Sequence, residues 1–345
     1  MSGNDTLLAV EDLTTTFETE SGRLVAADGV DFEVDRGETV CIVGESGSGK
    51  TVATESITRL VAEPPGRVEG SVRFDGQELT ERSDEELRDV RGNRIAHVFQ
   101  NPQEAMNHCY SVGWQLVEAI QVHDDVSEER ARARAVELLD RVGIANASTR
   151  IDDYPHEFSG GQKQRLMIAM ALVTNPDLLV ADEPTTALDV TVQAQILDLL
   201  SELQTELNMG LLFVTHDLGV VAEIADRVVV LYAGKVMERG DVYDVFDRPA
   251  HPYTRELLAC LPGRGETLAG IPGSLPDPTD PPDGCRFADR CEHAREACTV
   301  GDQPPERTIE PGHAVSCVYY GPEYDDAVVS SELDRPGPND PEVNR

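Results

Sequence analysis

The feature that most constrains this sequence is an eight-residue run, residues 44–51, that follows the pattern G-x-x-x-x-G-K-[ST]. Apolar residues 39–43 come directly before the run, and residues 52–61 after it have the apolar spacing of a helix. A strand, a glycine-rich loop and a helix in this order let backbone N–H groups surround phosphate oxygens. We therefore expect a phosphate-binding loop between a buried strand and a helix.

The side chains of this loop predict how it would bind ATP and Mg²⁺. Lys50 would reach the β- and γ-phosphates, and the hydroxyl of Thr51 would contact the metal ion. The N-terminus of the following helix adds the positive end of a dipole. A coincidental glycine-rich turn would lack this strand and this helix. The predicted ATP-binding residues of the loop are Gly44, Glu45, Ser46, Gly47, Ser48, Gly49, Lys50 and Thr51.

A second apolar stretch ends in two acids. Residues 178–181 are apolar and precede Asp182 and Glu183. Asp182 would hold Mg²⁺ through water, and Glu183 would polarise the attacking water as a general base. Two acids at the end of a strand are, taken alone, equally typical of a solvated turn. The phosphate-binding loop is what favours the catalytic interpretation.

The order of apolar stretches predicts an α/β fold with a mainly parallel sheet and helices on both faces. Strands are expected at 7–10, 30–34, 39–43, 70–74, 95–99, 178–181, 211–215 and 227–232, with a turn at Asp75-Gly76. Helices are expected at 52–61, 163–173 and 192–207. The early strands indicate an antiparallel β subdomain, and the mostly helical pattern over 102–175 indicates a helical subdomain.

Composition changes in the last third of the chain. Residues 262–284 are rich in Pro and Gly and predict a loop, whereas residues 321–345 are polar and acidic and predict a disordered tail. We therefore expect a nucleotide-binding domain over 1–250, a small extension over 251–320 and the tail after it.

The charge of the chain excludes some partners. Its 345 residues include 64 acids and 29 bases, giving a net charge of −35. Such a surface repels nucleic acid and anionic lipid. It is typical of halophilic proteins, whose salt-rich cytoplasm screens the repulsion, although an ordinary acidic protein is the alternative. The sequence has no run of 18 apolar residues and a polar start, which predict a cytoplasmic chain without a membrane span or a secretory signal.

A third motif lies between the phosphate-binding loop and the acidic strand end. It consists of Ser159, Gly160, Gly161 and Gln162, and a helical pattern follows it. A helix N-terminus of this kind offers free N–H groups to an anion, or it is simply a capped helix start. The run Ser-Gly-Gly-Gln in this place resembles the signature motif of ABC ATPases, which are P-loop NTPases.

The resemblance implies roles for further residues. Phe17 would stack on adenine, and Gln100 would sense Mg²⁺ and the membrane partner. Asp189 would form the D-loop, and His216 would contact the γ-phosphate. The implied catalytic residues are Glu183 and His216, and the implied Mg²⁺ ligands are Thr51, Gln100 and Asp182.

The resemblance also implies a dimer. In ABC ATPases two subunits pair head to tail, and ATP lies between the loop corresponding to 44–51 of one subunit and the segment corresponding to 159–162 of the other. The segment is preceded here by Phe158, where Leu is commoner, and both are apolar packing residues.

Residues outside the core resemble the peptide/nickel subfamily of ABC importers. They are 154–159, 251–254, 271–274 and 281–287. The resemblance covers residues 7–320 and implies an ATPase that energises uptake of di- or oligopeptides, or else of nickel or another small solute. His108 is a departure, because the subfamily usually has proline there. A soluble ABC ATPase of DNA repair or translation would need a second cassette, a coiled coil or a basic surface, and the sequence has none of these.

The subfamily implies partners and a location. The partners are two integral membrane permease subunits, a second ATPase subunit that is identical or homologous, and, indirectly, an extracytoplasmic solute-binding protein. The chain would then lie at the cytoplasmic face of the cell membrane, bound through the permeases.

Four of the seven cysteines lie close together in the sequence. A cytoplasmic chain is not expected to pair them in disulfides, and four thiolates suit either Zn²⁺ or an iron–sulfur cluster. Their spacing does not decide between these sites and unligated thiols, but the subfamily resemblance implies a [4Fe–4S] cluster. The implied ligands are Cys285, Cys291, Cys298 and Cys317, and the other cysteines, Cys41, Cys109 and Cys260, are expected to be buried apolar residues.

Overall fold

The computed structural model describes residues 6–101, 106–186, 188–261 and 270–330. The chain divides into two compact units. Unit 1 comprises Met1–Ala9, Glu33–Thr39 and Val72–Val214, and unit 2 comprises Val10–Phe32, Val40–Ser71 and Thr215–Arg345.

Unit 1 is centred on three parallel strands in the order β8-β7-β6. They are β6 (Ile95–Val98), β7 (Leu178–Asp182) and β8 (Gly210–Thr215). Leu178 pairs with Ile95 on one side and with Gly210 on the other, and every residue of β7 and β8 is buried. Strands that are buried on both faces have near-continuous apolar runs, which is why the sequence predicts them well.

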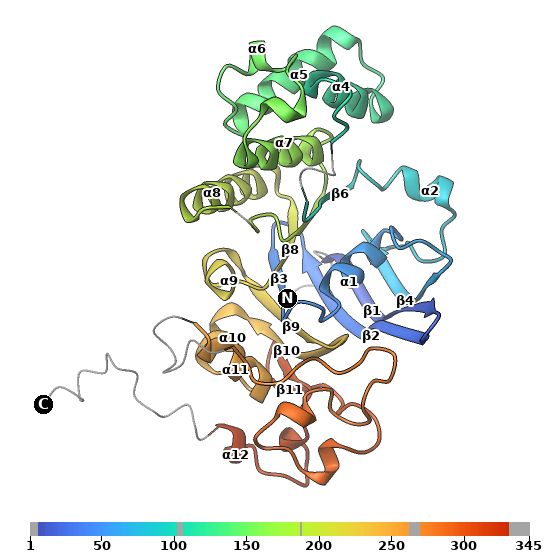
Figure 1. Ribbon diagram of the computed structural model, residues 1–345, viewed down its shortest axis with the longest axis vertical. Helices are drawn as coiled ribbons and strands as arrows, with labels where there is room; N and C mark the ends of the chain where they lie inside the picture. Colours follow the sequence, from blue (N-terminus) through green and yellow to red (C-terminus); the bar gives the residue numbers. More distant parts are fainter. Residues whose placement is uncertain (1–5, 102–105, 187, 262–269, 331–345) are drawn as a thin grey trace, which may run out of the picture. The chain divides into compact units, whose positions relative to one another are not determined.

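The helical pattern over 102–175 is confirmed in its described part, and residues 102–105 lie outside the described residues. Four helices pack against one another there: α4 (Val112–His123), α5 (Glu128–Arg141), α6 (Ala147–Arg150) and α7 (Gly160–Leu172) (Figure 1). Ser111 and Ser127 begin α4 and α5, because each hydroxyl accepts a hydrogen bond from a backbone N–H of the first turn.

Unit 2 contains strands in the order β11-β12-β10-β9-β3. They are β3 (Thr39–Val43), β9 (Arg227–Tyr232), β10 (Lys235–Asp241), β11 (Arg307–Glu310) and β12 (His313–Val315). Strand β3 pairs in parallel with β9, and the other neighbours are antiparallel. The hairpin of β11 and β12 comes from the C-terminal extension, and Val315 pairs with Glu238 of β10. The extension therefore continues this sheet, which its sequence pattern did not indicate.

A separate four-stranded sheet has the order β2-β1-β4-β5. Its strands are β1 (Thr6–Thr19), β2 (Gly22–Asp35), β4 (Gly66–Phe74) and β5 (Gln77–Glu78). Phe74 pairs with Gln77, so the predicted turn at Asp75-Gly76 is confirmed, with φ of 51° and 73°. Strands β1 and β2 are 14 residues each and thus much longer than predicted, because their partly exposed stretches have no continuous apolar run.

The remaining helices agree with the pattern where they are long and apolar. They are α1 (Lys50–Ile57), α2 (Asp84–Arg88), α8 (Val190–Leu207), α9 (Leu218–Ile224), α10 (Val242–Asp247), α11 (Pro252–Ala259) and α12 (Ala327–Ser330). Helix α1 begins two residues before the expected start at Val52 and ends four before Val61, ahead of the prolines at 64 and 65. The short helices α2, α9, α10, α11 and α12 were not predicted.

The predicted start of the disordered tail, at residue 321, lies too early in the chain. Residues 321–330 continue the folded chain and end in α12. Val329 is fully buried in a cluster with Val315, Cys317 and Tyr319, and this apolar contact orders a segment whose composition is otherwise polar. Residues 331–345 lie outside the described residues.

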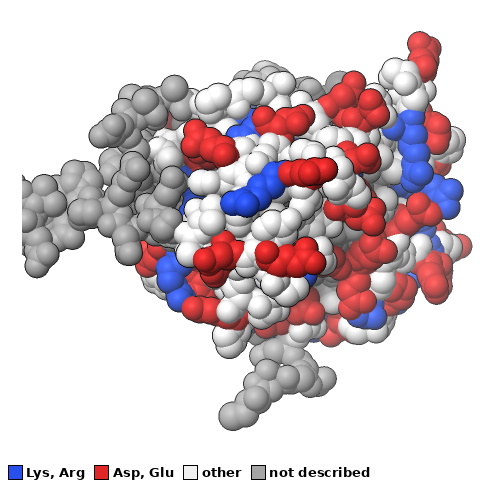
Figure 2. Space-filling view, turned by 90° about the horizontal axis from the view of Figure 1, so that it is seen from below, with Lys and Arg blue, Asp and Glu red and all other residues white. Residues whose placement is uncertain are grey.

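Two surface properties follow from the composition. Across the described ranges, no helix combines the length and the apolar character needed to cross a membrane. Figure 2 shows one face of the molecule with acidic side chains spread across it and few basic ones between them, as the net charge of −35 requires.

Candidate functional site

The loop at 44–51 lies between β3 and α1, as the sequence predicts. All five residues of β3 are buried, so the strand fixes the start of the loop. Gly49 is the N-cap of α1 with φ of 98°, a left-handed conformation that glycine adopts without strain. Ser46 and Gly47 are exposed at the tip.

Two glycines of the loop have no space for a side chain. A Cβ on Gly44 would lie 2.1 Å from the carbonyl oxygen of Leu231, and one on Gly49 would lie 2.1 Å from that of Ala26. The loop backbone is thus wedged against β9 and β2, and only glycine permits this approach.

Lys50 is folded back into the loop. Its side chain is 5% exposed, and Nζ donates hydrogen bonds of 2.8 Å to the carbonyl oxygens of Gly44 and Glu45. Ser48 Oγ is buried, and no group among the described residues forms a hydrogen bond with it. A buried ammonium and an unsatisfied hydroxyl in one loop fit a phosphate group, whose oxygens accept from both. Thr51 is exposed beside them at the start of α1.

The acidic strand end in unit 1 brings together residues predicted separately. Asp182 ends β7 and is 7% exposed, and Glu183 follows it with φ of 44°. A left-handed glutamate is uncommon, and such strain is typical of functional sites. Oε2 of Glu183 accepts hydrogen bonds from Gln100 Nε2 over 3.0 Å and from Thr186 Oγ1 over 2.9 Å.

Thr186 is a site residue that the sequence does not predict. Nothing in the spacing of a threonine three residues after a glutamate indicates a contact, because that contact depends on the unusual backbone of Glu183. The two donors fix one carboxylate oxygen and so set the direction of the side chain.

Residues 159–162 form a capped start of α7, which is one of the two interpretations that the sequence left open. Ser159 Oγ accepts from the N–H of Gln162, and Gln162 Oε1 accepts from the N–H of Ser159, which is a capping box. A Cβ on Gly161 would lie 2.9 Å from Val192, whereas one on Gly160 would meet no described atom within 4 Å. The turn is therefore open at Gly160. The guanidinium of Arg150 lies 3.9 Å from the ring centre of the neighbouring Phe158, so this aromatic residue has its own packing partner.

The other residues implied by the resemblance are placed individually. Asp189 is the N-cap of α8, and its Oδ1 accepts from the N–H groups of Thr191 and Val192. His216 is exposed directly after β8, and Phe17 is half-buried on β1. These positions leave the roles of the three residues toward ATP as predictions.

The four clustered cysteines, called here the cysteine group (Cys285, Cys291, Cys298 and Cys317), lie within electrostatic range of one another. The pKa of Cys285 and of Cys317 is raised to about 12 and that of Cys291 to about 11, mainly by burial and in smaller part by the neighbouring thiols. Within the described ranges, however, no three His, Cys, Asp or Glu side chains are gathered as ligands of one metal ion. Four thiols fit a metal–sulfur site in their chemistry, but the structure does not assemble them as one.

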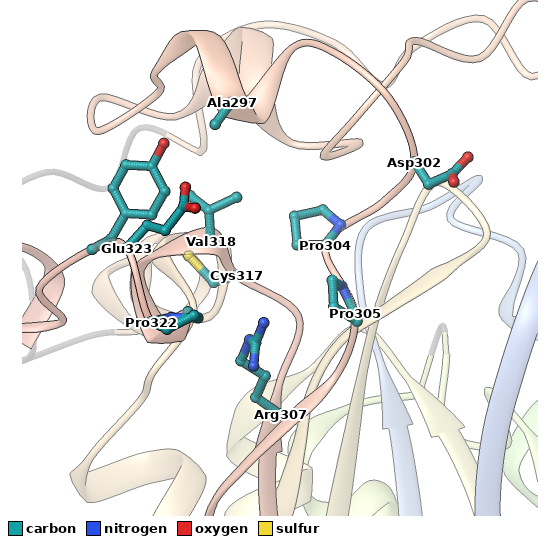
Figure 3. Close-up of a pocket in the computed structure, with 11 residues that line it drawn as sticks. Ala297, Asp302, Pro304, Pro305, Arg307, Cys317, Val318, Pro322 and Glu323 are labelled. Atoms are coloured by element: carbon teal, nitrogen blue, oxygen red, sulfur yellow. The ribbon is translucent and has the colours of Figure 1, made fainter.

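A cavity of about 340 Å³ borders the cysteine group (Figure 3). Cys317 and Val318 line one side, Pro304 and Pro305 the other, and Arg307 lies at its base (Figure 3). Cys317 is thus reachable from a hollow although it is only 7% exposed.

The remaining cysteines agree only in part with the expectation of burial. Cys41 is buried in β3, where burial raises its pKa. Cys109 is exposed before α4 and Cys260 is partly exposed at the end of α11, because neither lies on the inner face of an element.

Comparisons with known proteins decide the family. A family model described as ABC transporter matches residues 27–186. A putative peptide import ATP-binding protein of Brucella abortus is 49% identical, with 90% of this chain and 96% of that protein covered. This chain belongs to the ABC transporter family. The oligopeptide transport ATP-binding protein OppD of Bacillus subtilis is 48% identical, with 90% of this chain and 87% of OppD covered.

Solved structures of this ABC family share the fold. The dimeric structure of MJ0796, a bacterial ABC transporter cassette, has a TM-score of 0.62 at 30% identity and covers 68% of this chain and 98% of its own. A second dimeric structure of MJ0796, in a post-hydrolysis state with ADP and Pi, has a TM-score of 0.62 at 29% identity and covers the same shares.

The segments matched by the two family models contain different candidate residues. The ABC transporter match contains the phosphate-binding loop, Gln100, residues 159–162 and the acidic strand end. A second model, described as the oligopeptide/dipeptide transporter C-terminal region, matches residues 237–298 and so includes three members of the cysteine group but not Cys317.

Proposed function

We propose that this chain is the ATP-hydrolysing subunit of an importer for di- or oligopeptides. The observation that supports the ATP site is the closely packed loop at 44–51. In this loop the Lys50 ammonium and the unsatisfied Ser48 hydroxyl can both donate hydrogen bonds to an anion. The peptide cargo is supported by the printed names of the relatives and by the matched C-terminal region.

The loop binds and orients the phosphates. Its N–H groups and Lys50 hold the β- and γ-phosphates, and Thr51, Gln100 and Asp182 are the residues that would hold Mg²⁺. A bound Mg²⁺ would neutralise phosphate charge. Lys50 then exchanges its bonds to the loop carbonyls for bonds to phosphate.

Glu183 acts as the general base. Its carboxylate accepts a proton from the water whose oxygen attacks the γ-phosphorus, and the products are ADP and phosphate. Gln100 and Thr186 hold Oε2, so the carboxylate is oriented before the water arrives. His216 contacts the γ-phosphate, and Phe17 stacks on adenine.

The remaining assignments concern assembly. Two subunits pair head to tail, and residues 159–162, which begin the exposed N-terminus of α7, close on the partner's ATP, with Asp189 of the D-loop beside them. Two permease subunits hold the dimer at the cytoplasmic face of the membrane, and a solute-binding protein delivers the peptide. The second ATPase is identical or homologous.

Two further assignments rest on composition. The cysteine group holds a [4Fe–4S] cluster with a role in structure or in partner recognition, supported by four thiols in one segment of the chain. The excess of 64 acids over 29 bases is an adaptation to a salt-rich cytoplasm.

Uptake by cells tests the cargo. In the native host, the wild-type gene is replaced by one encoding Lys50→Ala, and uptake of a labelled tripeptide and of radioactive nickel is compared. Loss of peptide uptake with normal nickel uptake is expected. Normal peptide uptake in the variant would refute the proposal, and loss of nickel uptake alone would show that nickel is the cargo.

A further inference from the structure

Glu45, the second residue of the phosphate-binding loop, is held by a side chain of the C-terminal extension. Arg290 Nη1 and Nη2 lie 2.7 and 3.1 Å from the two carboxylate oxygens of Glu45, which is a bidentate ion pair. The Arg290 side chain is 6% exposed, so water screens the pair weakly.

The backbone of Glu45 is held from the same extension. Its N–H donates a hydrogen bond of 3.0 Å to the hydroxyl of Tyr253, which is fully buried in α11. The carbonyl oxygen of Glu45 in turn accepts from Lys50 Nζ over 2.8 Å. The peptide groups on both sides of Glu45 are therefore fixed, and the second one positions the lysine.

Arg290 is itself rigidly placed. Nη1 donates to the hydroxyl of Tyr232 over 3.1 Å, and the guanidinium lies 5.6 and 5.9 Å from the rings of Tyr232 and Phe287. Nε and Nη2 donate to the carbonyl oxygens of Pro272 and Ile271 over 2.8 and 2.9 Å. Five hydrogen bonds to four residues, two of them to Glu45, leave this arginine little freedom.

Arg290 and Tyr253, the two residues that hold Glu45, are connected to the cysteine group. Arg290 precedes Cys291 and ends a short 3₁₀ turn, Ala288–Arg290, in which the N–H of Ala288 donates to the carbonyl of Cys285. His251 Nδ1 accepts from the N–H of Tyr253, so its Nε2 carries the proton and lies 4.0 Å from Cys285 Sγ. Arg290 is therefore adjacent to Cys291 in the chain, and Tyr253 is linked to Cys285 through His251.

We propose that Arg290 and Tyr253 of the C-terminal extension are positioning residues that clamp Glu45 and keep the phosphate-binding loop in its ATP-binding shape. This inference rests on the proposed phosphate role of residues 44–51. The ion pair also neutralises a carboxylate that would otherwise repel phosphate from within the loop. The extension therefore contributes to nucleotide affinity as well as completing the sheet.

Binding of a fluorescent ATP analogue with Mg²⁺ tests the clamp on the full-length chain. Arg290→Met should raise Kd about tenfold, because the Glu45 carboxylate is left without its counter-charge. Arg290→Met combined with Glu45→Gln should recover most of the affinity, since the repelling charge is gone. A merely structural arginine would give no such recovery.

Further variants keep the test decisive if Arg290→Met folds poorly. Arg290→Lys keeps the charge and loses the bidentate geometry, so its Kd should lie between those of the wild type and Arg290→Met. Tyr253→Phe removes the acceptor for the Glu45 N–H and should weaken ATP binding less than Arg290→Met does. Arg295→Met is the matched control, because Arg295 in the same segment bonds to the Tyr319 hydroxyl instead.

The outcomes separate the clamp from the ATP site itself. Wild-type Kd for Arg290→Met and Arg290→Lys would overturn the clamp, and so would an equal loss of affinity in Arg290→Met and the double variant. If wild-type protein does not bind the analogue, or if Lys50→Ala binds it equally well, the proposed phosphate site is wrong and the clamp falls with it.

Discussion

Gln100 donates a hydrogen bond from Nε2 to Oε2 of Glu183 over 3.0 Å, although the two residues are 83 positions apart. Thr186 Oγ1 donates to the same oxygen over 2.9 Å. These two bonds define which way the proposed general base points, and they lie within unit 1.

Removing the threonine hydroxyl should slow hydrolysis without weakening ATP binding. In Thr186→Val the carboxylate of Glu183 keeps one donor and loses one, so kcat should fall about threefold to tenfold, the worth of one hydrogen bond. Thr186→Ser retains the hydroxyl and serves as the control. Steady-state kinetics measure both constants, and an unchanged kcat for Thr186→Val would remove Thr186 from the site.

Stability should rise with salt concentration. With 64 acids and 29 bases, the folded chain repels itself, and added KCl screens that repulsion. The melting temperature should therefore increase steadily between low and molar KCl. A melting temperature that is flat or falls over this range would contradict the proposed adaptation to salt.

Stability should fall as the pH drops from 6.5 toward 4, and His97 should account for part of the loss. Burial, with a smaller effect of the Arg91 charge, lowers the pKa of His97 from 6.5 to about 4. Below 6.5 the unfolded chain binds this proton while the folded chain does not, so the free energy of unfolding decreases until the pH passes the folded value.

The variant His97→Asn should flatten this pH dependence by at most about 1.4 kcal/mol per pH unit. His156→Asn is the control, because His156 is exposed. Denaturant titrations at several pH values measure the slope. Equal slopes in wild type and His97→Asn would show that His97 does not carry the effect.

The long, buried elements of this fold could be predicted from sequence, and the edges could not. Strand β9 was predicted with its observed bounds because all but its first residue are buried and apolar. Strands β11 and β12 have four and three residues, and their order comes from the pairing of β12 with β10 and of β11 with β12, which no local pattern encodes.

The candidate site shows the same division. The loop at 44–51 has a fixed spacing, so its phosphate role could be predicted from sequence. Arg290 could not be linked to it, because the ion pair with Glu45 joins residues 245 positions apart and depends on tertiary packing. Tyr253 was noted only as part of a subfamily motif.

Iron content tests the assignment of the cysteine group. Protein purified without oxygen should be brown and hold about four irons per chain. Cys298→Ser should remove the colour and loosen the extension. Since Arg290 precedes Cys291 and Tyr253 is linked to Cys285 through His251, the variant should also raise Kd for ATP while leaving kcat near the wild-type value.

Metal analysis decides among the alternatives for this group. Colourless protein with one zinc per chain would make it a zinc site. Colourless protein without metal, with four thiols that react with a thiol reagent, would leave no metal site. Cys109→Ser is the control, because Cys109 is exposed and lies outside the group.

The most direct measurement for the central claim is ATP hydrolysis by Glu183→Gln, compared with Glu202→Gln, an exposed acid on α8. The glutamine can still accept the hydrogen bonds of Gln100 and Thr186 but cannot take a proton from water. We expect kcat to fall at least about a hundredfold, with unchanged ATP affinity and an ATP-bound dimer on size-exclusion chromatography. Hydrolysis at the wild-type rate by Glu183→Gln would contradict the account.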